Sequence, residues 1–172
     1  MSTLIAYFSR EDENYFGGSM KYIEKGNTEV VAEKIASMID ADLFKIEMAK
    51  PYSKEYMKCI NEAKEDKQKG IRPSLVKDMA SIEAYDTVIL AYPNYWGTYP
   101  MAVLTFLEAH DFSGKRILPL CTNEGSGMGS SESDLKKLLV NAKIEKGLSI
   151  TGSSVHSSDG KVRSWLRNNG LC

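Results

Sequence analysis

Short apolar runs, each followed by a polar loop and then by an amphipathic stretch, constrain the fold of this chain more than any other feature. Residues 4–8 and 87–91 are nearly continuous apolar runs, as expected of strands buried on both faces. A helical pattern follows at 28–39. Further strands are predicted at 42–48, 116–122 and 147–151, and further helices at 53–69, 100–110, about 131–139 and from Asp159. Strand and helix alternate throughout, which predicts an α/β fold with a parallel sheet covered on both faces.

The chain is predicted to form one domain over residues 1–172. This length suits a single domain, and the sequence holds no internal repeat, low-complexity tract or linker. Two features need an explanation. Pro119 falls inside a predicted strand, although proline cannot donate to a ladder. The stretch 9–26 is too long for an ordinary connection, so it is either functional or mobile.

Charge and cysteine content narrow the functional classes. The formal net charge is −1 and no basic cluster stands out, so we expect neither nucleic acid nor a membrane as a partner. The charged stretch 64–69 is interpreted as a solvated helix face. Cys59, Cys121 and Cys172 are widely spaced, which indicates reduced thiols and no metal site. Residues 1–8 lack the features of a signal peptide and no membrane span is evident, so a cytoplasmic protein is expected.

A ligand is expected at the loops that follow the first, third and fourth strands. In a parallel sheet, ligands bind at the carboxyl ends of the strands, where the strand order switches. The first loop begins with Ser9 and Arg10 and ends with Gly26, Asn27 and Thr28 at the start of a helix. Its hydroxyl and amide groups, with the free N–H groups of the helix, suit a phosphate that Arg10 could pair with. The alternative is that Asn27 or Thr28 only caps the helix.

The loop after the third strand holds four aromatic side chains close together. We interpret Tyr92 and Tyr99 as packing on neighbouring helices. Tyr95 and Trp96, just before Gly97, are expected to meet a planar ligand, because aromatic side chains at a loop tip need a partner surface.

The loop after the fourth strand, 122–130, is rich in glycine and serine, so its backbone can approach a ligand closely. A dinucleotide-binding fingerprint is disfavoured, because the loop follows the fourth strand and ends in Ser130 where that fingerprint has a small glycine or alanine. Together the three loops offer a phosphate pocket, an aromatic platform and a close backbone wall. That combination suits a flat heterocycle joined to a monophosphate.

In these loops the chain resembles the flavodoxin-like FMN-binding proteins. The matching stretches are 7–9 with 26–28, 93–98 and 122–127, and the likeness extends to 165–166 in the last helix. The resemblance implies a three-layer sandwich, a five-stranded parallel sheet of order 2-1-3-4-5, and FMN as the cofactor. The cofactor-binding residues that it implies are Ser9, Arg10, Asn27, Thr28, Pro93, Asn94, Tyr95, Trp96, Gly97, Thr122, Asn123, Glu124, Gly125, Ser126 and Gly127.

The chain departs from typical flavodoxins at 11–25, which interrupts the phosphate loop. It therefore resembles a subset of the family in which this loop is lengthened. Tyr15, Phe16, Met20 and Tyr22 in that stretch either cover the flavin or a substrate pocket, or only anchor the insert.

The resemblance implies redox chemistry, and three functions are open. The first is an FMN-dependent oxidoreductase that takes hydride from NAD(P)H and reduces a quinone or similar small acceptor. The second is a flavodoxin-type electron carrier with a protein electron donor and a protein acceptor, and the third is a non-redox binding or regulatory module. Carriers are generally acidic, so a net charge of −1 favours the enzyme. No catalytic side chain is predicted, Glu124 and His156 are acid–base candidates to test, and a homodimer stays open.

Overall fold

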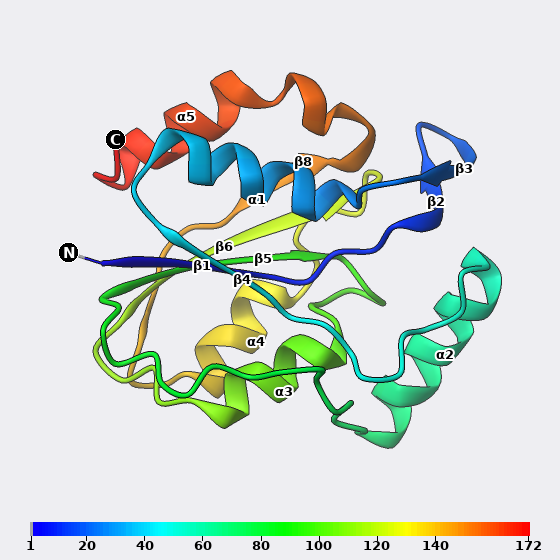
Figure 1. Cartoon of the computed structure of the whole chain (residues 1–172), viewed down its shortest axis with the longest axis horizontal. Helices are drawn as coiled ribbons and strands as arrows, with labels where there is room; N and C mark the ends of the chain where they lie inside the picture. The colour runs from blue at the N-terminus through cyan, green and yellow to red at the C-terminus, as the bar shows by residue number, and fades with distance from the viewer. Residues whose placement is uncertain (1) are drawn as a thin grey trace.

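Six parallel strands form the central sheet of the computed structural model, which describes residues 2–172 (Figure 1). The strands are β1 (Thr3–Tyr7), β4 (Asp42–Lys45), β5 (Thr87–Pro93), β6 (Arg116–Asn123), β7 (Lys143–Ile144) and β8 (Leu148–Thr151). Their order is β4-β1-β5-β6, and both β7 and β8 pair with the far edge of β6. The predicted order 2-1-3-4-5 is confirmed, with the fifth position divided between two short strands.

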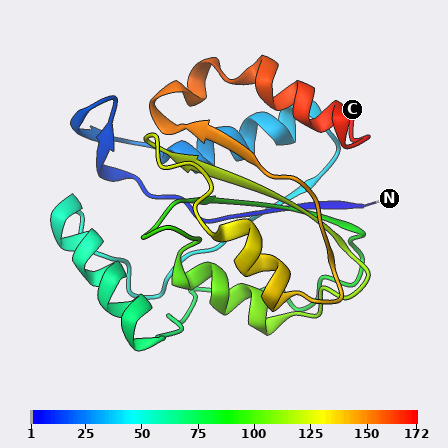
Figure 2. The same ribbon diagram turned by 180° about the vertical axis from the view of Figure 1, so that it is seen from behind.

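Helices cover both faces of the sheet, which confirms the three layers. The helices are α1 (Asn27–Met38), α2 (Tyr56–Lys69), α3 (Met101–Ala109), α4 (Ser131–Leu138), the 3-10 helix η1 (Gly152–Ser157) and α5 (Asp159–Asn168). Helices α1 and α5 lie on one face, and α3 and α4 on the other (Figure 1 and Figure 2). Side chains of β1 alternate between two cores, with Leu4 and Ala6 in one and Ile5 and Tyr7 in the other.

Pro119 sits in β6 where the neighbouring strand is interrupted. The pairing of β7 with β6 ends at Ile117, and that of β8 begins at Leu120. The carbonyl of Ile117 accepts a hydrogen bond from the N–H of Glu145 at 2.9 Å, so every second residue of β6, Pro119 included, directs its polar groups to the fifth position. The missing N–H of Pro119 therefore faces the gap between β7 and β8, where no ladder bond is lost.

The long first loop, residues 9–26, contains an antiparallel hairpin. Strands β2 (Asp12–Phe16) and β3 (Ser19–Ile23) pair in full register. Gly17 and Gly18 join them at φ of +63° and +96°, the left-handed region that a two-residue hairpin turn requires. The Gly-Gly pair between Phe16 and Ser19 was the sequence signal for this turn.

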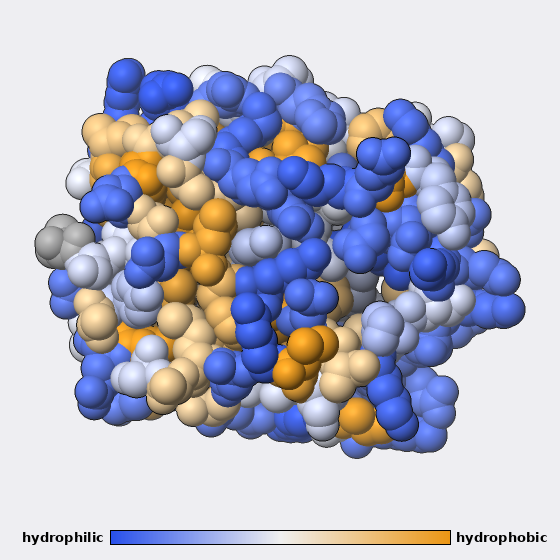
Figure 3. Space-filling model, viewed as in Figure 1, coloured by the Kyte–Doolittle hydropathy of each residue, from blue (hydrophilic) through white to orange (hydrophobic). Residues whose placement is uncertain are grey.

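Helix α2 stands beyond the carboxyl ends of the sheet strands, beside the hairpin (Figure 1). It packs on α3 and on β2 and does not cover a face of the sheet. The helix predicted at 53–69 begins only at Tyr56, and the strand predicted at 42–48 ends at Lys45. Hydrophilic side chains cover most of the end of the molecule that holds the hairpin and α2 (Figure 3).

Helices α4 and α5 begin at Ser131 and Asp159, as the sequence predicts, and their N-caps are Ser130 and Ser158. Ser131 does not cap α4, because its buried hydroxyl donates to the carbonyl of Met128 at 2.6 Å.

Within residues 2–172, no helix has both the length and the apolar character needed to cross a bilayer. The same part of the chain contains no cluster of metal-ligating side chains. Cys59 and Cys121 are buried free thiols, and Cys172 is an exposed one.

Candidate functional site

The N-terminus of α1 is left open by the residues around it. Gly26 is the N-cap and offers no side chain, and neither Asn27 nor Thr28 caps the helix. Instead, the hydroxyl of Ser9 accepts a hydrogen bond from the N–H of Glu29 at 3.0 Å. A Cβ on Gly26 would lie 2.0 Å from Ser9 Oγ, so only glycine lets the two ends of the first loop meet here. The remaining N–H groups of this turn form an anion site of the kind that phosphate prefers.

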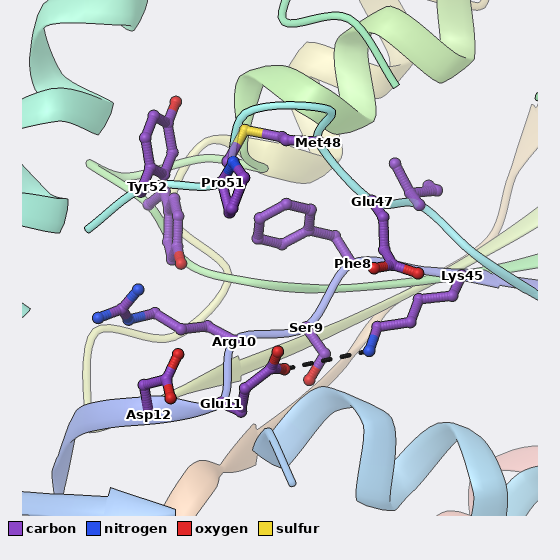
Figure 4. Close-up of a pocket in the computed structure, with 12 residues that line it drawn as sticks. Phe8, Ser9, Arg10, Glu11, Asp12, Lys45, Glu47, Met48, Pro51 and Tyr52 are labelled. Atoms are coloured by element: carbon purple, nitrogen blue, oxygen red, sulfur yellow. Dashed lines mark ion pairs between the residues drawn. The ribbon is translucent and has the colours of Figure 1, made fainter. Parts of the chain in front are cut away.

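The carboxylate of Glu29 lies in the first turn of α1, where it would repel a phosphate. Lys45, at the end of β4, contacts it at 3.0 Å, and both side chains are largely buried. Glu11 approaches the same ammonium at 4.0 Å (Figure 4). Burial and the Glu29 charge raise the pKa of nearby Tyr7 to about 12. Lys45 thus neutralises the carboxylate of Glu29, which would otherwise repel a phosphate at the start of α1.

The first loop, residues 9–26 after β1 together with the first turn of α1, and the third loop, residues 122–130 at the end of β6, are joined by a buried contact between two hydroxyl groups. Thr28 Oγ1 and Thr122 Oγ1 lie 2.8 Å apart. The residues come from the start of α1 and the end of β6, and both are almost fully buried. A hydroxyl pair of this kind leaves one proton free to donate to a bound anion.

Asn94 joins the second loop, residues 93–100 at the end of β5, to the third loop. Its side-chain amide donates to the carbonyl of Gly127 at 3.0 Å and accepts from the N–H of Gly97 at 2.9 Å. Trp96 and Gly97 have φ of +54° and +87°, so they form a tight turn closed by Tyr95 and Thr98. A bulky residue in this left-handed conformation is strained, and such strain is concentrated at functional sites.

The third loop is held by its own side chains. Asn123 Oδ1 accepts hydrogen bonds from the N–H groups of Gly125 and Gly127 at 3.0 and 2.9 Å. Glu124 accepts from the N–H and the hydroxyl of Ser153 at 2.9 and 3.1 Å. The loop is therefore fixed to η1, and the carboxylate of Glu124 is engaged with protein donors.

Gly152 and Ser153, at the start of η1, belong to the site although the sequence analysis did not select them. A Cβ on Gly152 would lie 2.5 Å from Asn27 Nδ2 and 3.2 Å from Glu124 Oε1. The signal available in the sequence was a Gly-Ser pair directly after the last strand, at the same edge of the sheet as the other loops.

These loops enclose a cavity of about 210 Å³, here called the loop cavity. It lies between the phosphate turn of α1, the second loop and the third loop, and Asn14 and Tyr15 of the hairpin close it. Its lining residues from the predicted set are Arg10, Asn27, Thr28, Pro93, Asn94, Tyr95, Thr122, Asn123, Glu124 and Ser126. Its lining residues outside that set are Asn14, Tyr15, Tyr56 and Gly152.

A second cavity of about 320 Å³, here called the α2 cavity, adjoins the first. The two share several lining residues, among them Arg10, Asn94 and Tyr95. One wall is the inner face of α2, and Trp96, which contacts α2, and Gly97 also line the cavity. The residues that α2 contributes are Tyr56, Cys59, Ile60 and Ala63. The helical spacing of Tyr56, Ile60 and Ala63 places them on one face, and that face is turned towards this cavity instead of towards the sheet.

Arg10 also lines a third cavity of about 160 Å³, on the β4 side of the first loop, and Ser9 lines this cavity but neither of the other two (Figure 4). Arg10 points back over this region, and its guanidinium donates to the carbonyls of Glu13, Ser53 and Lys54 at 2.9–3.3 Å. Arg10 therefore ties the hairpin to the chain entering α2. Its expected pairing with a phosphate would have to use the one guanidinium N–H that these contacts leave.

Tyr95 and Trp96 point in different ways. The ring of Trp96 is 44% exposed, and its indole N–H donates to the carbonyl of Ile60 at 2.8 Å. Lys67 donates to the carbonyl of Trp96 at 2.6 Å, and Lys64 lies 5.2 Å from the indole centroid. Tyr95 instead packs its ring edge-on to Phe8, with centroids 5.8 Å apart. The turn is thus fastened to α2 by Trp96, while Tyr95 is directed inward.

The burial and contacts of the remaining aromatic and acid–base candidates show which of them lie at the loop cavity. Tyr92 and Tyr99 are buried with their rings edge to face, and the Tyr92 hydroxyl donates to Ser131 of α4, in line with the expected packing on a helix. His156 lines a separate cavity beyond α1 and does not approach the loop cavity. Tyr22 and Met20 are exposed on the hairpin, and only Tyr15 of the insert's candidate residues lines the loop cavity.

The two adjoining cavities fit a flat heterocycle joined to a monophosphate. An open helix N-terminus with hydroxyl groups beside it suits the phosphate, and the close approaches at Gly26 and Gly152 shape a cradle that a Cβ would fill. The aromatic turn and the glycine-rich loop flank the other end.

Comparison with known proteins agrees with this geometry. The sequence profile of the flavodoxin family matches residues 16–169. Among solved structures, a protein of Bacteroides eggerthii assigned as a flavoprotein is 26% identical, with a TM-score of 0.77 and 99% of each chain covered. A flavoprotein of Lactobacillus acidophilus solved with FMN is 19% identical, with a TM-score of 0.64, covering 91% of this chain and 97% of that one. An NADH:FMN oxidoreductase in its apo form is 17% identical, with a TM-score of 0.53, covering 98% of this chain and 86% of that one. A search of curated proteins finds no match.

Proposed function

Because the chain belongs to the flavodoxin family and its cofactor is FMN, we propose that it is an FMN-dependent oxidoreductase that passes electrons from NAD(P)H to a quinone or similar small acceptor. The observation that carries this proposal is the pair of adjoining cavities. One carries the polar groups that a phosphate needs, and the other is walled by apolar side chains of α2. A small molecule fits concave spaces of this kind, whereas a protein partner uses a broader and flatter surface.

The phosphate of FMN is assigned to the first loop. Ser9, Asn27 and Thr28 surround the open N-terminus of α1, where N–H groups and the helix dipole favour an anion. Thr122 supports this end through its contact with Thr28. Arg10 acts mainly by holding the hairpin over the cavity.

The ring of FMN is assigned to the second and third loops. Residues 93–97 would lie along one side and 123–127 along the other, and the Asn94 bridge fixes the distance between them. Bound there, FMN supplies transfer of one or two electrons, and the surrounding protein tunes its potential. Glycine at 125 and 127 leaves no side chain between the loop backbone and the ring edge.

The insert and α2 favour the enzyme over the carrier. Arg10 and Glu13 bind the hairpin to residues 53–56, so both elements stand together over the cavities. This arrangement shields the site from a docking protein but leaves room for a small acceptor. A structural neighbour named as an NADH:FMN oxidoreductase is consistent with a nicotinamide electron donor and supports this choice.

The test is the absorbance spectrum of the protein with FMN, followed by NAD(P)H oxidation with 1,4-naphthoquinone. We expect flavin bands that persist through gel filtration and steady turnover with the quinone. A flavin-loaded protein that accumulates a stable blue semiquinone without turnover would instead identify an electron carrier. A protein that binds no FMN would contradict both redox functions and favour a non-redox binding module.

A further inference from the structure

The β2–β3 hairpin crosses one side of the loop cavity and is held at both of its ends. At the tip, a Cβ on Gly17 would lie 3.7 Å from the Cβ of Ser153, so the turn rests close to η1. At the base, Arg10 and Glu13 bind the hairpin to residues 53–56, where the chain enters α2. An isolated two-stranded hairpin is only marginally stable, so these contacts fix its place. The middle of β2 is therefore held beside the cavity.

Tyr15 is the aromatic side chain that this arrangement brings to the loop cavity. It lines the cavity, and 41% of the residue is exposed. Phe16, the next residue, lines instead the separate cavity beyond α1, and the ammonium of Lys21 lies 4.7 Å from its ring centroid. A half-exposed aromatic ring at the wall of a cavity offers apolar surface that a flat ligand removes from water. The position of Tyr15 therefore favours contact with a bound ring.

The other walls of the loop cavity indicate which part of FMN reaches this tyrosine. Residues 93–95 and 122–124 line the same cavity as Tyr15, and they come from the two loops along which the flavin ring is assigned. The phosphate end, at Asn27 and Thr28, offers polar groups, whereas the tyrosine offers mainly an aromatic face. Two aromatic rings attract each other in offset-stacked or edge-to-face arrangements. A tyrosine on a third element can thus cover the flavin ring where the two loops do not.

We propose that Tyr15 is a cofactor-contacting residue, whose ring packs against the flavin ring of FMN bound between the second and third loops. Arg10 and Glu13 act as positioning residues, because they hold the hairpin that carries Tyr15 beside the cavity. The insert is thereby part of the cofactor site. This goes beyond the proposed function, since it requires FMN to bind but holds for an enzyme and for an electron carrier alike.

The test compares Tyr15→Leu, Tyr15→Phe and Tyr22→Leu in the full chain. Leucine removes the planar ring and keeps an apolar side chain, whereas phenylalanine keeps the ring and removes only the hydroxyl group. Tyr22 is the matched control, because it lies on the paired strand of the same hairpin, is 62% exposed and lines neither the loop cavity nor the α2 cavity. FMN affinity is measured by fluorescence titration, and stability by the thermal midpoint of the protein without FMN.

We expect Tyr15→Leu to weaken FMN binding by about two- to tenfold, the range for the loss of one aromatic pair. Tyr15→Phe should bind FMN as tightly as the wild type, because its ring still covers the flavin. Tyr22→Leu should also leave FMN affinity unchanged. Neither Tyr15 variant should lower the thermal midpoint more than Tyr22→Leu does.

Four results would overturn the contact: unchanged FMN affinity in Tyr15→Leu, an equal loss in Tyr15→Phe, an equal loss in Tyr22→Leu, or a thermal midpoint that falls in Tyr15→Leu alone. The second would assign the hydroxyl group instead of the ring to FMN, and the last two would make the effect one of hairpin stability. Failure of the proposed function looks different. FMN binding that depends on Tyr15, without NAD(P)H oxidation, refutes the enzyme and leaves the contact standing, whereas turnover with FMN affinity indifferent to Tyr15 refutes only the contact.

Discussion

Gly129→Ala tests how closely the third loop lies on the turn that faces the flavin site. Gly129 has a φ of +55°, and a Cβ there would lie 2.1 Å from the carbonyl oxygen of Gly97 and 2.6 Å from its carbonyl carbon. These atoms are backbone, so they cannot rotate away. Ser130 donates to the same oxygen through its N–H at 2.7 Å, which fixes the approach.

The expected loss of stability has two parts. A non-glycine residue in the left-handed region costs about 1–2 kcal/mol. Overpacking against a rigid neighbour adds about 1–3 kcal/mol. The sum is about 2–5 kcal/mol, which is a large share of the stability of an ordinary domain.

Gly127→Ala separates the two parts. Gly127 has a φ of +69°, but a Cβ there would meet nothing within 4 Å. Its substitution should therefore cost only the conformational part, about 1–2 kcal/mol. Both glycines lie in one loop, so effects on loop flexibility in the unfolded chain largely cancel in the comparison.

The free energy of unfolding of both variants is measured by urea denaturation, with the slope checked for constancy. Gly129→Ala should have the lower midpoint, and its FMN affinity should fall more than that of Gly127→Ala because Gly97 must move. If the two variants unfold at the same urea concentration, the contact between Gly129 and Gly97 is not tight in the folded protein, and the reasoning fails.

Three other changes test the phosphate end and the far edge of the sheet. Thr28→Val should weaken FMN binding by about 1–3 kcal/mol in a fluorescence titration, because a charge-assisted hydrogen bond to the phosphate is lost and Thr122 loses its partner. Unchanged FMN affinity would remove Thr28 from the phosphate site. Lys45→Met should lower FMN affinity by up to about fivefold, with a larger effect at low salt, because the carboxylate of Glu29 is then unpaired. An FMN affinity that changes neither with this substitution nor with salt would contradict the role of Lys45. Lys143 and Arg116 hold the pKa of Glu145 below its ordinary value, so its contribution to stability is complete above about pH 4.3 and disappears as the pH falls through the lowered pKa. In urea unfolding, Glu145→Gln should flatten the acid side of the stability profile, and an unaltered profile would rule the group out.

The layers and the strand order could be predicted from the sequence because burial on two faces leaves a readable pattern. The runs at 4–8 and 87–91 are almost entirely apolar, and the structure pairs them in register at the centre of the sheet. The division of the fifth strand could not be read in this way. Its two pieces pair with β6 over two and four residues, which is too few for an alternating hydrophobic pattern to appear. Pro119 was the only sign of the division in the sequence.

The sequence predicted that three loops meet at one edge of the sheet, which the structure confirms, but their internal contacts could not be predicted. Parallel topology alone brings the ends of β1, β5 and β6 to one edge. The use of Arg10 differs from its prediction because a guanidinium goes to whichever acceptors the folded chain offers, and here these are carbonyls at 13, 53 and 54. Only the acceptor at 13 lies in the hairpin, and the sequence signals that hairpin through the Gly17-Gly18 pair alone, because the alternation of 12–23 is weak.

Helix α2 shows what an amphipathic stripe leaves open. The spacing of Tyr56, Ile60 and Ala63 predicts that one face of the helix is covered, but it says nothing about what covers it. In this chain the insert takes part of that role: Glu13 accepts from the N–H of Tyr56 at 2.9 Å and Arg10 holds the residues before it. The hairpin and the start of α2 are therefore held together by these contacts. We expect removal of the hairpin to release α2 and to open the second cavity, because the contacts that hold the start of the helix would be lost.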